Sequence, residues 1–170
     1  LGSFAIRAAI ERAGIDAAEI EEVIMGNVLQ AGLGQNPARQ AALKAGLPQS
    51  VPCTTVNKMC GSAMEAAILA HDMLASGSHD VIVAGGMESM TNAPYLLPKA
   101  RAGYRMGHQV VQDHMFLDGL EDAYDKGRLM GTYAEDCATK FAFTREEQDR
   151  FALASLSRAL AANNDGTFGW

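Results

Sequence analysis

The apolar residues in the first half of the chain recur at helical spacing in three stretches. We expect a helix from Ser3 to Arg12, capped by Ser3 and ended by Gly14, and a second helix over residues 37–45. A third helix is expected over residues 59–76, where small residues are frequent. Small residues allow neighbouring backbones to approach closely, so we expect this third helix to be buried on more than one side.

Branched apolar residues gather instead in three short runs between these helices. They predict strands over residues 22–29, 51–56 and 80–86. The run over residues 80–86 is almost continuously apolar, a pattern typical of a strand that is buried on both faces of a sheet. Helices and strands therefore alternate, and this alternation predicts an α/β layered core.

The pattern changes in the second half of the chain. Residues 88–130 are rich in Met, Pro, Gly and His and keep no sustained periodicity, which indicates a long excursion of the functional or interface-forming kind. Helical spacing resumes over residues 132–143 and again beyond residue 144. We therefore divide the sequence into an α/β segment, residues 1–88, and a loop domain with helices, residues 89–170.

Composition narrows the class of protein. With 48% hydrophobic and 20% charged residues among 170, the chain is typical of a globular domain with a core. A formal net charge of −6 disfavours nucleic acid as a partner, and no apolar run reaches the ~20 residues of a membrane span. Three cysteines without zinc-site or disulfide spacing predict no metal and a reducing compartment, for which we take the cytoplasm.

One short segment suggests covalent chemistry. The run Val56-Asn-Lys-Met-Cys60-Gly-Ser-Ala-Met places a thiol where a strand turns into a helix. Free N–H groups and the dipole at a helix start favour the thiolate, which is the reactive form of cysteine. A lone cysteine can equally be a small core residue, and His71, eleven residues further along the helix, lies too far away to act as its base. The residues alone leave both interpretations open.

Four segments, in order, resemble the thiolase family. Asn57-Lys-Met-Cys60-Gly-Ser-Ala resembles the family's active-site signature, Asn-x-x-Cys-(Gly/Ala)-Ser-(Gly/Ala). The other three matching segments are Gly34-Gln-Asn-Pro-Ala-Arg, Val83-Ala-Gly-Gly-Met-Glu-Ser-Met90, and Asp118-Gly-Leu together with Met130-Gly-Thr-Tyr-Ala-Glu. With their order and spacing, the resemblance covers nearly the whole chain to about Phe168, and it is to the N-terminal half of a thiolase.

The resemblance implies a fold and an activity. The fold would be a thiolase-like N-terminal α/β layered domain, incomplete, with an inserted loop domain. Thiolases condense two acetyl-CoA molecules to acetoacetyl-CoA, or cleave a 3-ketoacyl-CoA in the reverse direction. Cys60 would take the acyl group as a thioester, and its backbone N–H would be an oxyanion donor.

The resemblance also implies binding residues and partners. Leu120 and Met130 would line the groove for the pantetheine arm and the acyl chain, with packing inside the loop domain as the alternative. Coenzyme A would enter as a substrate, without a permanently bound cofactor. The protein would be a homo-oligomer, a dimer or tetramer, in lipid metabolism.

Two motifs of the family do not occur in the sequence. Thiolases carry a catalytic histidine in Gly-His-Pro and a second catalytic cysteine in Cys-x-Gly, and this chain has neither. Cys53 and Cys137 do not match the second motif and are expected to pack in the core. We therefore expect a catalytically incomplete chain. A ketoacyl-synthase-type enzyme and a non-catalytic piece that serves only assembly remain as alternatives.

Overall fold

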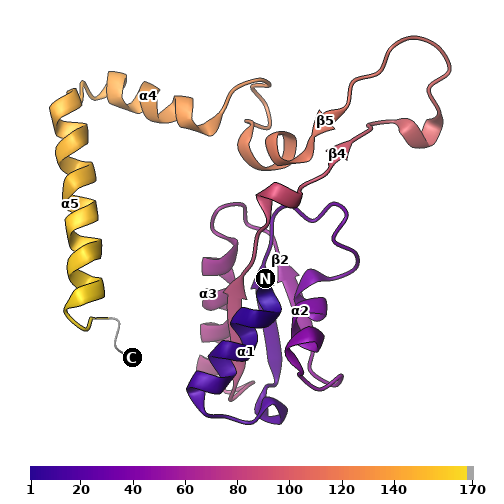
Figure 1. The fold of residues 1–170 in the computed structure, drawn as a ribbon, viewed down its shortest axis with the longest axis vertical. Helices are drawn as coiled ribbons and strands as arrows, with labels where there is room; N and C mark the ends of the chain where they lie inside the picture. Colours follow the sequence, from indigo (N-terminus) through magenta and orange to yellow (C-terminus); the bar gives the residue numbers. More distant parts are fainter. Residues whose placement is uncertain (168–170) are drawn as a thin grey trace. The chain divides into compact units, whose positions relative to one another are not determined.

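In the computed structural model, strand β1 (Glu22–Gly26) is the centre of a three-stranded parallel sheet and organises the first part of the chain. It pairs with β2 (Cys53–Val56) on one side and with β3 (Ile82–Gly86) on the other (Figure 1). In this register Gly26 is level with Val56 and with Gly86. The carboxyl ends of all three strands therefore meet at one edge of the sheet.

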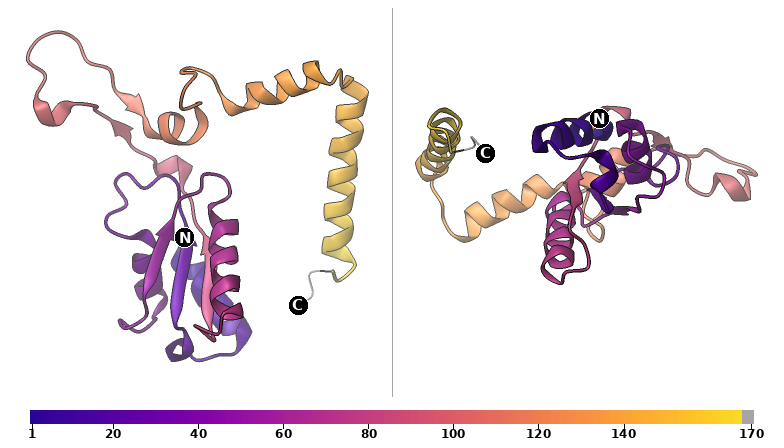
Figure 2. Two further views of the ribbon diagram at one scale, coloured as in Figure 1. Left: turned by 180° about the vertical axis from the view of Figure 1, so that it is seen from behind. Right: turned by 90° about the horizontal axis from the view of Figure 1, so that it is seen from below.

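Helices cover the two faces of this sheet. Helices α1 (Gly2–Ala13) and α2 (Pro37–Ala45) pack on one face, and α3 (Ser62–Ala75) packs on the other (Figure 2). Side chains alternate along a strand, so Val23 and Met25 enter the core with α1 and α2, whereas Gly26 meets α3. The predicted α/β layered fold is confirmed.

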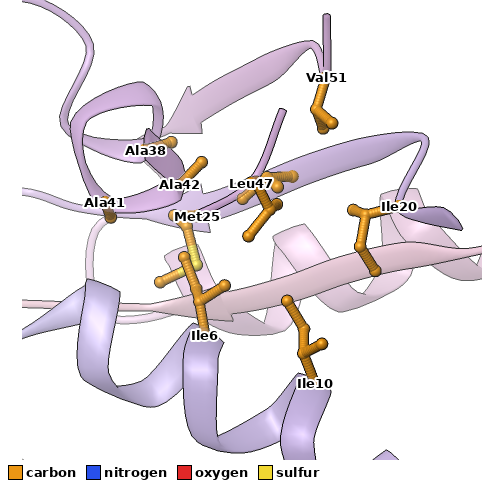
Figure 3. Packing of buried hydrophobic residues seen from close by; sticks show 10 residues of the cluster. Ile6, Ile10, Ile20, Met25, Ala38, Ala41, Ala42, Leu47 and Val51 are labelled. Atoms are coloured by element: carbon orange, nitrogen blue, oxygen red, sulfur yellow. The ribbon is translucent and has the colours of Figure 1, made fainter. Parts of the chain in front are cut away.

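The main core lies between β1 and the helices α1 and α2 (Figure 3). Its side chains are apolar and mostly below one-tenth exposed, and burial of each large one contributes about 1.5–3 kcal/mol. The cluster comprises Ile6, Ile10, Ile20, Val23, Met25, Ala38, Ala41, Ala42, Leu47 and Val51.

The element boundaries agree with the sequence pattern to within a few residues: the strands are shorter than predicted, and α4 is shifted toward the N-terminus. Helix α2 spans the predicted residues, and Gly14 ends α1 in a left-handed conformation as expected. Helix α1 begins earlier than predicted, with Leu1 as its N-cap, and Ser3 lies inside it without a capping bond. Helix α3 begins at Ser62, because the residues before it form a separate turn.

The predicted burial of α3 and β3 was wrong in part. On α3 the buried residues are Ser62, Ala66 and Ala70, while Met64 is 71% exposed, and no residue of β3 is fully buried. Within residues 1–167, which the structure describes, the sheet covers α3 on one face only. Small and apolar residues along α3 therefore did not indicate how many of its faces are covered.

Residues 88–130 hold little regular structure, as predicted. Strands β4 (Tyr95–Leu96) and β5 (Gln112–Asp113) form a short antiparallel pair, and Phe116–Leu120 makes a π-helical turn. The chain separates into two compact units, Leu1–Ala123 and Tyr124–Trp170, so most of this excursion belongs to the first.

The second unit contains α4 (Met130–Lys140) and α5 (Arg145–Asn164). Thr144 and Glu147 form a capping box at the start of α5, in which each side chain accepts a hydrogen bond from the other residue's backbone N–H. In the part of the chain that the structure describes, the helices are too short or too polar to span a bilayer.

Candidate active site

Cys60 sits in a tight turn between β2 and α3 that its neighbours hold in place. Asn57 Oδ1 accepts a hydrogen bond from the N–H of Met59, 3.0 Å away. Ser62 is buried, and its hydroxyl accepts from the N–H of Lys58 at 2.9 Å and donates to the carbonyl of Met59. The side chain of Cys60 is exposed. The Asn and Ser of the signature thus build the turn, and the cysteine is left free for chemistry.

The turn contains a strained residue directly before the thiol. Met59 has a φ of 50°, a left-handed conformation that costs a non-glycine residue about 1–3 kcal/mol. Its bonds to Asn57 and Ser62 hold it there. Methionine carries no sequence signal for this conformation, which is why the apolar spacing places Met59 in the helix. Cys60 consequently lies two residues before the first residue of α3.

Two glycines let α3 begin directly against the strand ends. A Cβ atom on Gly26 would lie 2.6 Å from the backbone N of Ala63 and 2.6 Å from the carbonyl carbon of Ser62. A Cβ on Gly86 would lie 2.8 Å from the Cβ of Ala63. The ends of β1 and β3 therefore need glycine, and this close approach fixes the position of the turn that carries Cys60.

A cavity of about 320 Å³ opens beside the thiol. It is bounded by the carboxyl ends of β1 and β3, the Cys60 turn, and the residues of the π-helical turn. Ligands of α/β proteins bind at this edge of a parallel sheet. The lining residues are Gly26, Val28, Leu29, Met59, Cys60, Ser62, Ala63, Gly86, Met87, Glu88, Met90, Met115, Gly119 and Leu120.

A hydrogen-bond network beneath the cavity joins the ends of β1 and β3. The carboxylate of Glu88 accepts from the N–H groups of Val28 (2.9 Å) and Leu29 (3.0 Å) and from Asn27 Nδ2 (3.0 Å). Asn27 is 2% exposed, and its Nδ2 also donates to the carbonyl of Met87 at 2.9 Å. Glu88 is thereby committed to holding the loop after β1. The sequence pattern did not indicate either residue.

The predicted binding residues lie in different units. Leu120 lines the cavity together with Cys60, whereas Met130 is the first residue of α4 in the second unit and is 46% exposed. Cys53 is half-buried on β2, in keeping with a packing role. Cys137 is exposed, and α4 has no buried residue, so the predicted core packing of Cys137 was wrong for this unit.

No histidine is among the residues that line the cavity within the described chain. His71 and His108 are exposed, His79 is half-buried, and His114 is buried next to the π-helical turn. Within residues 1–167 no cluster of His, Cys, Asp and Glu could hold a metal ion. Cys60 and Glu88 are the ionisable residues of the described lining, and Glu88 is already hydrogen-bonded.

Fold and site together define an α/β protein that presents an exposed thiol to an apolar cavity at the carboxyl edge of its sheet. The family profile described as the N-terminal domain of thiolase matches residues 1–169. The chain therefore belongs to the thiolase family.

Curated relatives agree with this assignment. The chain is 55% identical over 171 residues to acetyl-CoA acetyltransferase 2 of Arabidopsis thaliana, covering all of this chain and 42% of that protein. It is 52% identical to the acetyl-CoA acetyltransferase of Pseudomonas aeruginosa and 51% identical to that of Schizosaccharomyces pombe, with 99% of this chain and 42% of each relative covered. The chain thus spans less than half the length of these relatives.

Proposed function

We propose that this chain is the nucleophile-bearing part of an acyl-CoA acyltransferase of the thiolase type. The observation that carries the proposal is Cys60: an exposed thiol on a turn held by Asn57 and Ser62, beside an apolar cavity of about 320 Å³. The relatives' names, acetyl-CoA acetyltransferase, point to acetyl-CoA as the acyl donor.

The first chemical step uses groups of this chain. The Cys60 thiolate attacks the carbonyl carbon of the acyl thioester, an S–C bond forms, and the C–S bond to coenzyme A breaks, releasing its thiolate. The tetrahedral intermediate carries a negative oxygen, and we assign the backbone N–H of Cys60 as one donor to it. The apolar lining of the cavity beside Cys60 suits the apolar part of the acyl group.

The second step joins or separates acyl groups. In synthesis the enolate of a second acetyl-CoA attacks acyl-Cys60 to give acetoacetyl-CoA, and in thiolysis a 3-ketoacyl-CoA is cleaved in reverse. Both directions need a base, and the described cavity wall has no histidine. We therefore assign acyl capture to this chain and the complete cycle to a protein that also supplies the base.

Further assignments belong to the same proposal. Leu120, which lines the cavity, and Met130 would contact the pantetheine arm and the acyl chain. Residues 1–88 would form the α/β domain and residues 89–170 the loop domain with its helices. Exposed apolar residues such as Met64 (71%) and Met106 (93%) support a homo-oligomer, a dimer or tetramer. We place the protein in the cytoplasm and in lipid metabolism.

Acyl capture is tested by intact mass spectrometry of the full-length protein that contains these residues. After mixing with acetyl-CoA, we expect a gain of one acetyl group, which added coenzyme A removes. Cys60→Ala should abolish the gain, because it deletes the nucleophile. Cys137→Ala is the matched control, since Cys137 is another exposed cysteine, and it should acetylate as the unaltered protein does. Acetylation that survives in Cys60→Ala would refute the proposal.

A further inference from the structure

Behind the cavity wall lies a buried histidine with both ring nitrogens engaged. His114 is 5% exposed. The backbone N–H of Ala31 donates to its Nε2 at 3.3 Å, and its Nδ1 lies 2.6 Å from Oδ2 of Asp118. An N–H can only donate, so Nε2 is the acceptor and the ring proton is on Nδ1, pointing at Asp118. The ring therefore bridges two segments as a neutral donor and acceptor.

Both segments contribute to the wall of the cavity. Ala31 belongs to the loop after β1, which lines the cavity through Val28 and Leu29. Asp118 belongs to the π-helical turn, which lines it through Gly119 and Leu120. The walls already touch, because a Cβ on Gly119 would lie 3.3 Å from Cδ2 of Leu29. Any change in their separation alters the width of the cavity.

The backbone that carries His114 is itself held by hydrogen bonds. The backbone N–H of His114 donates to the carbonyl of Pro94 at 3.2 Å, directly after the β4–β5 pair. The next residue, Met115, lines the cavity, and its N–H donates to Oδ1 of Asp113 at 2.9 Å. A buried imidazole is costly unless both nitrogens are satisfied, and here both are. The side chain is thus held in one orientation.

We propose that His114 is a positioning residue that sets the width of the cavity beside Cys60 and, through it, the length of apolar chain that the cavity accepts. The ring fastens the loop after β1 to the π-helical turn and keeps the walls at their observed separation. This inference rests on the proposed role of Cys60 for its consequence, selection of acyl chains. Its test needs only the thiol and the cavity.

The test compares two alkylating reagents on the full-length protein. Iodoacetamide and N-hexyl iodoacetamide both react by attack of the Cys60 thiolate on carbon, with formation of a thioether and release of iodide. Only the hexyl reagent carries an apolar chain that can occupy the cavity beside the exposed thiol. The rates at Cys60 are followed by peptide mass spectrometry. The rate with the hexyl reagent divided by the rate with iodoacetamide reports cavity shape separately from thiol reactivity.

Three substitutions at His114 separate its hydrogen bond to Ala31 from its hydrogen bond to Asp118. His114→Ala removes both bonds and should lower the rate ratio about fivefold, as expected for the loss of a net contribution near 1 kcal/mol. His114→Gln can still accept from Ala31, and His114→Asn can still donate to Asp118. Each should therefore lower the ratio less than His114→Ala does. His108→Ala, an exposed histidine of the same excursion, is the control and should keep the ratio.

Several outcomes would overturn the inference. An unchanged ratio in His114→Ala does so, and so does an equal loss of both rates, which would mean that the ring supports the fold and not the cavity width. If His114→Ala does not fold, the Gln and Asn variants decide, and wild-type ratios in both refute the bridge. Because neither reagent contains coenzyme A, a failure of acetylation leaves this result standing, and the reverse also holds.

Discussion

Replacing Gly26 by alanine tests the contact that positions the nucleophile turn. The new Cβ would lie 2.6 Å from two backbone atoms of Ala63 and Ser62, whereas ordinary contact begins at 3.4 Å. Backbone atoms cannot rotate away, so either the start of α3 or the end of β1 must move. Overpacking of this kind costs typically about 1–3 kcal/mol, and two backbone contacts place Gly26→Ala near the upper end, at about 3 kcal/mol.

Urea unfolding and Cys60 alkylation measure this effect together. With a slope of about 2 kcal/mol per molar urea, Gly26→Ala should lower the unfolding midpoint by about 1.5 M. The rate of Cys60 alkylation by iodoacetamide should change as well, because the displaced segment carries the thiol. A free energy of unfolding that falls without any change at Cys60 would show that the clash is absorbed away from the turn.

Gly85→Ala is the matched control in the same protein. Gly85 is the neighbouring glycine of β3, and a Cβ there would meet Met25 Sδ at 3.6 Å, an ordinary contact with a flexible side chain. We expect a change in the free energy of unfolding within about 0.5 kcal/mol and unaltered alkylation of Cys60. Equal stability of the Gly26 and Gly85 variants would refute the reasoning.

Two further predictions concern the hydrogen bonds around the site. Ser62→Ala leaves the N–H of Lys58 without its acceptor, so it should lower the free energy of unfolding in urea by about 1–3 kcal/mol. It should also slow the acetylation of Cys60, and acetylation at the normal rate would show that the turn does not need the hydroxyl. Asn27→Asp puts a carboxylate against Glu88 in a 2% exposed position and should destabilise by about 3 kcal/mol near neutral pH, with partial recovery at acidic pH, where a carboxyl is protonated. Equal stability at both pH values would exclude charge repulsion between residues 27 and 88.

Much of the fold was predictable because its signals are local. Apolar spacing and runs of branched apolar residues marked the helices and the three strands of the parallel sheet, Gly14 marked the end of α1, and Pro37 marked the start of α2. The signature around Cys60 is enough to single out the nucleophile candidate, since Asn57 and Ser62 build its turn through contacts only a few residues apart. Such short-range bonds depend on neighbours in the chain, which a sequence displays directly.

The cavity and its supports were decided by tertiary structure. Asn27 bonds Glu88 across 61 residues, and Ala31 bonds His114 across 83 residues. The local sequence does not predict either pair, because an isolated Asn, Glu or His is equally compatible with an exposed loop. The sequence by itself determined which elements form and where the thiol lies. Only the parallel pairing of β1, β2 and β3 brought distant segments to one sheet edge, where close approach and buried hydrogen bonds shape the site.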